Sequence, residues 1–309
     1  MITTVCANPC IDDTIIVEEL KLGIVNRVIK NRIDASGKGI NVAIVLKRLG
    51  YESKSIGFNY VGKGDLIQER VRSNNVPFEF ITCDGAVRTN YKIINEKDSK
   101  MTEINENGGF VNEPQKKALL ELAAAHAKSS EMIIFSGSLP MGCDDNFYKD
   151  LILACGDAKC VLDTEGKKFG IGLDAKPFLV KPNQFELSLY VGRELEETNE
   201  ILSAALEIVK KGVKIVAVSL GGKGALITDG EKAYLADSVS VVVKSTVGAG
   251  DSFVAALCMG IAQKKSLKEA FAMGMAGGTG CVITEGTQLV TLEAYNKYLP
   301  MIKVHELQL

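Results

Sequence analysis

Short apolar strands alternate with helices through the middle of the chain, and this alternation constrains the fold more than any other feature. Apolar runs predict buried strands at residues 132–135, 160–163, 178–181 and 215–220. Helical patterns between and around them lie at residues 114–128, 145–154, 184–191 and 200–211. Because parallel strands need such crossover helices, the sequence predicts an α/β fold, with a mostly parallel sheet covered by helices on both faces.

The same reading extends to both ends of the chain. Further strands are predicted at residues 3–7, 53–58, 225–228, 232–236 and 240–243, and further helices at residues 38–49 and 65–73. Four other segments alternate apolar with polar residues, at 14–18, 27–33, 89–95 and 101–105. Half-polar strands of this kind indicate a separate small sheet with one open face.

Composition narrows the class of protein. The 309 residues can bury a large core, and 46% of them are hydrophobic. A net charge of −2 offers no basic surface for nucleic acid or an anionic membrane. No apolar run reaches the roughly 18 to 20 residues needed to span a bilayer, and the N-terminal residues lack the order of a signal peptide. We therefore expect a cytoplasmic protein with no nucleic-acid or membrane partner.

Cysteine and histidine usage limits the chemistry. The eight cysteines form no CxxC pair, and neither of the two histidines has the spacing of a zinc ligand, so we expect reduced, buried thiols. The histidines, His126 and His305, lie in a helical pattern and near the C-terminus. A general base should therefore be a carboxylate.

A glycine turn before an apolar helix supplies such a carboxylate. Gly248 and Gly250 allow a sharp turn, and residues 252–261 form an almost unbroken apolar helical run. The free N–H groups and the dipole at such a helix start favour an anion. Asp251 stands at this start, where it could act as an N-cap or remove a proton from a hydroxyl that attacks a phosphate.

Two motifs carry a resemblance to a known family. Residues 246–252 (TVGAGDS) resemble the second signature of the ribokinase-like (PfkB) family of sugar kinases, and residues 35–43 (ASGKGINVA) resemble the first. The resemblance implies a doubly wound ribokinase-like fold. It also implies a large domain of residues 1–11, 35–86 and 109–309, and a small β lid of residues 12–34 and 87–108.

The resemblance gives the glycine turn a mechanism. Asp251 would be the catalytic base, and the N–H groups of Gly248, Ala249 and Gly250 would stabilise charge on the transferring phosphoryl group. Lid closure would exclude water.

Other motifs match the hexose-phosphate branch of the family. Each of two motifs follows a predicted strand: Asn8-Pro-x-x-Asp12 and Ser136-Gly-Ser-Leu-Pro140. Taken alone, Asp12 could simply stabilise a turn, and Lys38 in the first signature could be a solvated lysine. The implied substrate-binding residues are Asp12, Gly37, Lys38, Gly39, Asn41, Arg88, Ser136, Gly137 and Ser138. We expect Lys38 and Arg88 to hold the phosphate already on the sugar, while Arg27 is a less specific candidate in the lid.

The nucleotide side has its own motifs. The implied ATP-binding residues are Lys181, Asn183, Ser219, Leu220, Gly221, Gly222, Lys223, Gly224, Thr246 and Gly250. Residues 219–224 could equally be a plain hairpin turn. Asn183 and Glu186 read as a capping box, and the family pattern implies that they also organise Mg²⁺ through water. No P-loop or dinucleotide motif competes.

The implied reaction is transfer of the ATP γ-phosphoryl group to the 6-hydroxyl of fructose 1-phosphate. The same chemistry on tagatose 6-phosphate stays open, as does a sugar-phosphate-binding regulator without catalysis. Many relatives carry an aspartate where this chain has Ser245, so dependence on a monovalent cation also stays open. The exposed edges of lid strands favour a homodimer through the lid.

Overall fold

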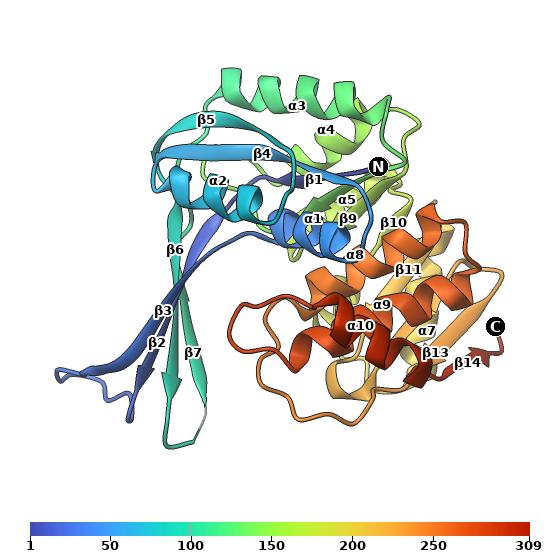
Figure 1. Ribbon diagram of the computed structural model, residues 1–309. Coiled ribbons are helices and arrows are strands. Elements are labelled where there is room, and N and C mark those ends of the chain that lie inside the picture. The colour runs from blue at the N-terminus through green and yellow to red at the C-terminus, as the bar shows by residue number, and fades with distance from the viewer. Residues whose placement is uncertain (99) are drawn as a thin grey trace.

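Two sheets organise the chain, whose computed structural model describes residues 1–98 and 100–309 (Figure 1). Within these residues the larger sheet has ten strands. In spatial order they are β14 (Val304–Leu307), β13 (Ala233–Ala236), β12 (Ala225–Thr228), β11 (Ile215–Ser219), β10 (Leu179–Val180), β9 (Cys160–Asp163), β8 (Met132–Ser136), β1 (Ile2–Cys6), β4 (Ser53–Gly62) and β5 (Phe78–Ala86). Neighbours from β11 to β5 are parallel, and β12 to β14 form an antiparallel edge.

Helices cover both faces of this sheet. They are α1 (Lys38–Arg48), α2 (Gly64–Ser73), α3 (Glu113–Ala127), α4 (Phe147–Ala154), α5 (Lys167–Gly172), α6 (Gln184–Val191), α7 (Thr198–Lys210), α8 (Ala249–Ala262), α9 (Leu267–Val282) and α10 (Leu292–Tyr298). Helices α3 and α4 lie on one side of β1 and β4, and α1 and α2 lie on the other (Figure 1). The predicted mostly parallel α/β fold is confirmed.

The centre of the core lies where α1 packs against both β1 and α8. Residues 39–46 of α1 and 251–260 of α8 are buried, as expected of helices that are apolar on nearly every side. Gly39 allows the close approach, because a Cβ at this position would lie 2.5 Å from the carbonyl oxygen of Val5. This packing fixes the first turns of both helices at one end of the sheet.

The smaller sheet extends away from the larger one (Figure 1). Its order is β3 (Val28–Ser36), β2 (Cys10–Val17), β6 (Arg88–Asn95) and β7 (Met101–Asn105). Its first two strands, β2 and β3, therefore span residues 10–36, which extend two residues beyond each end of the predicted lid segment 12–34. Strand alternation places Asp12, Asn90 and Asn105 on one face, and Ile33 and Ile104 on the other.

One predicted strand is wrong. Residues 240–243 lie in an irregular stretch between β13 and α8. Both edges of β13 are already paired, with β12 and with β14, so the alternating Ser-Val sequence has no free edge to join. The strand β14 and the strand β5 were not predicted, because β14 is short and partly polar and β5 contains Asp84 and Gly85.

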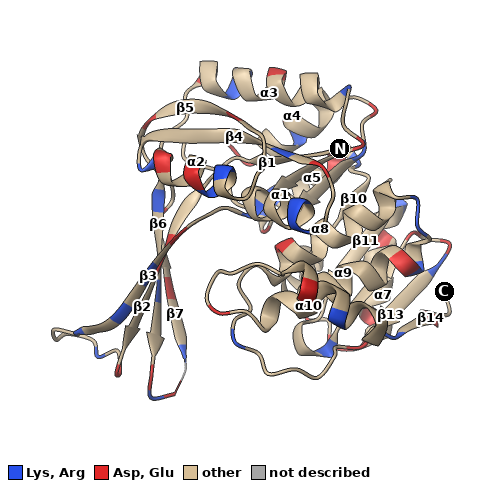
Figure 2. Ribbon diagram, viewed as in Figure 1, with Lys and Arg blue, Asp and Glu red and all other residues tan. Residues whose placement is uncertain are grey.

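The surface chemistry agrees with the composition. Basic and acidic residues are interspersed over the helices and the lid strands (Figure 2). None of the helices in residues 1–98 and 100–309 is long and apolar enough to cross a bilayer. All eight cysteines are free, and all but Cys143 are buried.

Candidate active site

A cavity of about 1850 Å³ lies at the carboxyl ends of the central parallel strands, between the large domain and the lid sheet. The strand order reverses direction at β1, since β4 pairs with one edge of β1 and the later strand β8 pairs with the other. Ligands of open α/β sheets bind at such a switch point. The cavity brings together most of the residues singled out in the sequence.

The predicted residues on the cavity wall lie on β2 and β6, at the ends of β8, β10 and β11 or in the loops that follow them, and in or just before the first turns of α1, α6 and α8. They are Asp12, Gly37, Lys38, Asn41, Arg88, Ser136, Gly137, Ser138, Lys181, Asn183, Glu186, Ser219, Leu220, Gly221, Gly222, Gly224, Thr246, Gly248, Ala249, Gly250 and Asp251. Gly39, Lys223 and Arg27 are not part of this wall. Gly39 packs against β1, and Arg27 is exposed on the lid.

Asp251 is the third residue of α8 and does not cap the helix. The N-cap is Gly248, whose φ of 80° is in the left-handed region that favours glycine. Asp251 is 5% exposed, and its Oδ2 accepts a hydrogen bond from Nδ2 of Asn41 at 2.8 Å. Burial raises the pKa of Asp251 to about 6, although Lys38 opposes this shift. A carboxyl group with this pKa can accept a proton near neutral pH.

Two lysines flank a buried carboxylate beside Asp251. Asp163 ends β9, and its oxygens lie 3.2 Å from Nζ of Lys181 and 3.6 Å from Nζ of Lys38. Burial alone would raise the pKa of Asp163, but the two lysines outweigh burial and lower it. Asp163 in turn raises the pKa of Lys38, and Asp251 adds to this effect. Lys38 thus lies on the Asp251 side of the cavity.

Sequence reasoning missed Asp163, although a signal existed. Its run Val161-Leu162-Asp163 puts a carboxylate at the carboxyl end of a buried parallel strand, where a charge needs a partner or a ligand. The two lysines supply that partner from α1 and from the end of β10.

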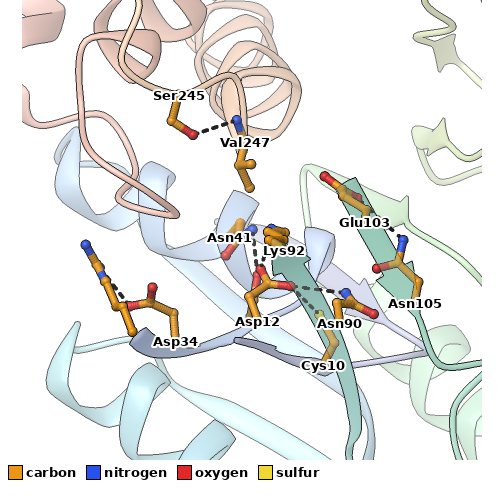
Figure 3. A network of polar contacts seen from close by, with 12 residues as sticks. Cys10, Asp12, Asp34, Asn41, Asn90, Lys92, Glu103, Asn105, Ser245 and Val247 are labelled. Atoms are coloured by element: carbon orange, nitrogen blue, oxygen red, sulfur yellow. Dashed lines mark hydrogen bonds and ion pairs between the residues drawn. The ribbon is translucent and has the colours of Figure 1, made fainter. Parts of the chain in front are cut away.

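The base of the lid holds a second polar cluster (Figure 3). Asp12 on β2 is 2% exposed, and its Oδ2 lies 3.0 Å from Nζ of Lys92 on β6. Its Oδ1 accepts a hydrogen bond from Nδ2 of Asn90 at 3.1 Å. Lys92 and Asn90 also line the cavity, and neither was singled out in the sequence.

Arg88 lies near this cluster at the start of β6. Its Nη1 donates to the carbonyl oxygen of Glu106 at 3.0 Å, and its buried Nε has no hydrogen-bond partner among the described residues. Nearby, Nδ2 of Asn8 donates to Oγ of Ser138 at 3.0 Å, which ties the loop after β1 to the loop after β8. Ser136 is buried, and its Oγ likewise lacks a partner in the described chain.

The opposite wall carries the nucleotide motifs. Asn183 and Glu186 form the capping box of α6: Oδ1 of Asn183 accepts from N of Glu186, and Oε2 of Glu186 accepts from N of Asn183, both at 2.8 Å. Burial raises the pKa of Glu186. Residues 219–224 connect the antiparallel strands β11 and β12, so they do form a hairpin connection, and most of that connection lines the cavity.

Gly250 offers a test of the turn as a phosphate cradle. A Cβ at this position would lie 3.6 Å from Nζ of Lys181, which is ordinary contact, so the backbone accepts a Cβ without a clash. We expect Gly250→Val to lower kcat strongly while the melting temperature changes little, because the side chain would occupy the space of the phosphate. Loss of activity only in proportion to unfolding would make Gly250 a structural glycine.

Comparison with known proteins agrees with this site. The family described as pfkB family carbohydrate kinase matches residues 6–294. The 1-phosphofructokinase of Bacillus subtilis (strain 168) is 33% identical over 309 residues, which cover 99% of this chain and 100% of the relative. The 1-phosphofructokinase of Escherichia coli (strain K12) is 32% identical, over 95% of this chain and 96% of the relative.

Solved structures show the same similarity. Phosphofructokinase-2 from Escherichia coli, in complex with substrates and products, has a TM-score of 0.90 and 30% identity, over 97% of this chain and 98% of the other. Arabidopsis thaliana ribokinase, at 23% identity, shares the fold with a TM-score of 0.81, over 96% of this chain and 98% of the other.

The doubly wound sheet, with Asp251 in the first turn of α8 on the cavity wall, agrees with these carbohydrate-kinase relatives. The chain belongs to the pfkB family of carbohydrate kinases, since that family matches most of its length. The two curated relatives above are both named 1-phosphofructokinase. The enzyme class is therefore a phosphotransferase with an alcohol group as acceptor.

Proposed function

We propose that this chain transfers the γ-phosphoryl group of ATP to the 6-hydroxyl of fructose 1-phosphate, giving fructose 1,6-bisphosphate and ADP. The carrying observation is Asp251, a buried carboxylate on the cavity wall at the start of α8, in a chain 33% identical to a 1-phosphofructokinase. Tagatose 6-phosphate gains no support from these relatives, and their names, which are those of an enzyme, argue against a regulator without catalysis.

In the proposed mechanism Asp251 accepts the proton of the 6-hydroxyl while the oxygen attacks the phosphoryl group. Asn41 orients the carboxylate through its hydrogen bond to Oδ2. The N–H groups of Gly248 and Gly250, together with the helix dipole, stabilise charge on the transferring group, whereas N of Ala249 already donates to the carbonyl oxygen of Thr246 at 3.3 Å.

The two lysines beside Asp163 add to this stabilisation. Lys38 and Lys181 lie next to the base, so we assign both to the transferring phosphoryl group rather than to the phosphate already on the sugar. Arg88, at the base of the lid, remains the candidate for that resident phosphate. An arginine suits this task because its fork can bind two phosphate oxygens at once.

Membership of the family implies ATP and a divalent metal ion. We propose Mg²⁺, held through water by Asn183 and Glu186. The donor set fits, because Glu186 is a half-buried carboxylate on the cavity wall and its Oε1 stays outside the capping box. When bound, the ion would neutralise charge on the phosphates of ATP. Oγ of Ser245 accepts a hydrogen bond from N of Val247 at 3.2 Å, so it stabilises the turn, and potassium dependence stays open.

The lid segments, residues 12–34 and 87–108, are proposed to close over the sugar and exclude water, which would otherwise compete for the phosphoryl group.

A cytoplasmic location also stays a prediction from the sequence.

A substrate panel tests the proposed function. Fructose 1-phosphate, tagatose 6-phosphate, fructose 6-phosphate and fructose are compared at matched concentrations by ADP formation. The proposal expects the highest kcat/KM for fructose 1-phosphate. A preference for tagatose 6-phosphate would select the other substrate, and binding without any turnover would select the regulator.

The outer face of the lid favours a homodimer. Ile33 and Ile104 lie on the face that points away from the cavity and are 59% and 56% exposed. Val28 and Ile29 on β3 add further exposed apolar area at 55% each. Exposed apolar side chains on an open sheet are typical of an interaction surface, so we propose pairing of two copies through this face.

Replacing Ile33 by lysine should convert this dimer to a monomer, because the interface would have to bury charged groups in place of an apolar side chain. Sedimentation velocity measures the result. Leu153→Lys is the matched control, since Leu153 is 57% exposed on α4, outside the lid. A wild-type chain that sediments as a monomer, or an Ile33→Lys variant that stays dimeric, would refute the lid interface.

A further inference from the structure

We propose that Lys92 is a positioning residue that balances the charge of Asp12, so that the base of the lid can accept an anionic sugar phosphate. This inference rests on the proposed function, because it concerns the sugar side of the same cavity. It goes beyond that function in assigning Lys92, which no sequence motif marked.

The contact itself is close and shielded from water. Nζ of Lys92 lies 3.0 Å from Oδ2 of Asp12, and the two side chains are 7% and 4% exposed. Asn90 donates to the other oxygen of Asp12, and the thiol of Cys10 lies 3.7 Å from that same oxygen. Asp12 is therefore held at both oxygens by groups of the lid sheet itself (Figure 3).

The strand register shows that the side chain of Lys92 does not lie directly opposite Asp12. Lys92 lies opposite Thr14 in the pairing of β2 with β6, and the residue opposite Asp12 is Asn90. The side chain of Lys92 must therefore run diagonally along the sheet, by one two-residue step, to meet Asp12. A lysine that only had to stay solvated would extend to water instead.

Electrostatics explains why the pair belongs beside a sugar phosphate. A buried carboxylate can accept hydrogen bonds from sugar hydroxyls, but by itself it repels a phosphate that binds nearby. The ammonium of Lys92, 3.0 Å from Oδ2 of Asp12, offsets this charge. Asp163 has the same arrangement on the other side of the cavity, where Lys38 and Lys181 balance it.

A purely structural role for the pair would predict something different. Strands β2 and β6 are already paired along eight residues each, and β2 is paired with β3 on its other edge. The sheet therefore does not need the ion pair to hold its register. Removing Lys92 would leave the charge of Asp12 uncompensated. Because Asp12 lines the cavity, we expect this charge to weaken binding of the sugar phosphate.

A double-mutant cycle between Lys92→Met and Asp12→Asn tests the assignment. The cycle uses the ketohexose phosphate that the wild-type enzyme turns over best, so a wrong choice of sugar in the proposed function does not prevent the measurement. In the wild-type background, Lys92→Met should raise KM for the sugar phosphate by about 10-fold or more, the scale of losing one partner of a buried charge pair. KM for ATP and kcat should stay within about 3-fold.

In the Asp12→Asn background the same substitution should change KM for the sugar phosphate by less than about 3-fold, because no carboxylate charge is left to balance. Equal effects in both backgrounds would overturn the proposal, since Lys92 would then bind the substrate independently of Asp12. Calorimetric binding of the same sugar phosphate without ATP gives a second readout that needs no turnover.

Two further variants guard against unfolding and non-specific charge effects. Lys92→Arg keeps the positive charge, so it should keep KM for the sugar phosphate closer to wild type than Lys92→Met does, even if the methionine variant folds poorly. Lys30→Met removes an exposed lid cation that does not line the cavity and should leave KM unchanged. A KM increase in Lys30→Met as large as in Lys92→Met would also overturn the proposal.

Discussion

Replacing Asp251 by asparagine is expected to lower kcat by about 10²-fold or more, the scale of general-base catalysis. Asparagine has nearly the same shape and cannot accept the proton. KM for ATP and for the sugar phosphate should stay within a few-fold, because the carboxylate acts on the hydroxyl only in the transition state. Steady-state kinetics with both substrates varied measures the split.

The pH profile of the wild type provides the control. Because burial raises the pKa of Asp251 to about 6, kcat measured at saturating ATP and sugar phosphate should fall as pH falls through about 6, where the base becomes protonated. The residual activity of Asp251→Asn should lose this acid limb. A variant with near-normal kcat, or an acid limb that persists in it, would show that Asp251 is not the base.

The second large effect concerns Lys38, which the sequence analysis assigned together with Arg88 to the phosphate already on the sugar. Lys38→Met is expected to lower kcat by about 10²- to 10³-fold, the scale of removing one donor from a developing charge. KM for the sugar phosphate should change little, because Lys38 lies with Asp163 beside Asp251. Lys47→Met, near the C-terminal end of the same helix and outside the cavity wall, is the matched control and should behave like wild type.

Arg88→Met should have the opposite signature. KM for fructose 1-phosphate should rise by about 10- to 150-fold, the equivalent of roughly 1.5 to 3 kcal/mol for a charge-assisted contact, with kcat nearly unchanged. Turnover of free fructose should barely respond, because it lacks the phosphate. If Lys38→Met instead raised KM for the sugar phosphate and left kcat intact, the expectation from the sequence would hold, and Lys38 and Arg88 would both bind the phosphate already on the sugar.

The hydrophobic pattern of the sequence correctly predicted the strands and helices that are buried on nearly every side. The central strands near residues 132–135 and 160–163 and the helix at residues 38–49 formed close to their expected positions, because each is buried on nearly every side. Residues 240–243 failed for a reason outside the local sequence. Whether a Ser-Val alternation becomes a strand depends on a free sheet edge, and β14, some sixty residues further along the chain, already pairs with β13.

The candidate site divides in the same way. Glycines and charges in short motifs pointed to Asp251, Asn183 and Glu186, and these residues do line one cavity. The ion pairs of the site could not be predicted, because Lys38 lies far along the chain from Asp163, and Lys92 lies far from Asp12. The helix start also mattered: α8 begins at Ala249, which moves Asp251 from a cap position into the first turn.

Identification of the product tests the central claim most directly. The enzyme is incubated with ATP and fructose 1-phosphate, and the product is followed by ³¹P NMR alongside ADP formation. The proposed function predicts one new phosphate ester at C6, retention of the ester at C1, and one ADP for each fructose 1,6-bisphosphate formed. ADP formation without a new sugar ester, or no reaction with fructose 1-phosphate under conditions where tagatose 6-phosphate is phosphorylated, would contradict it.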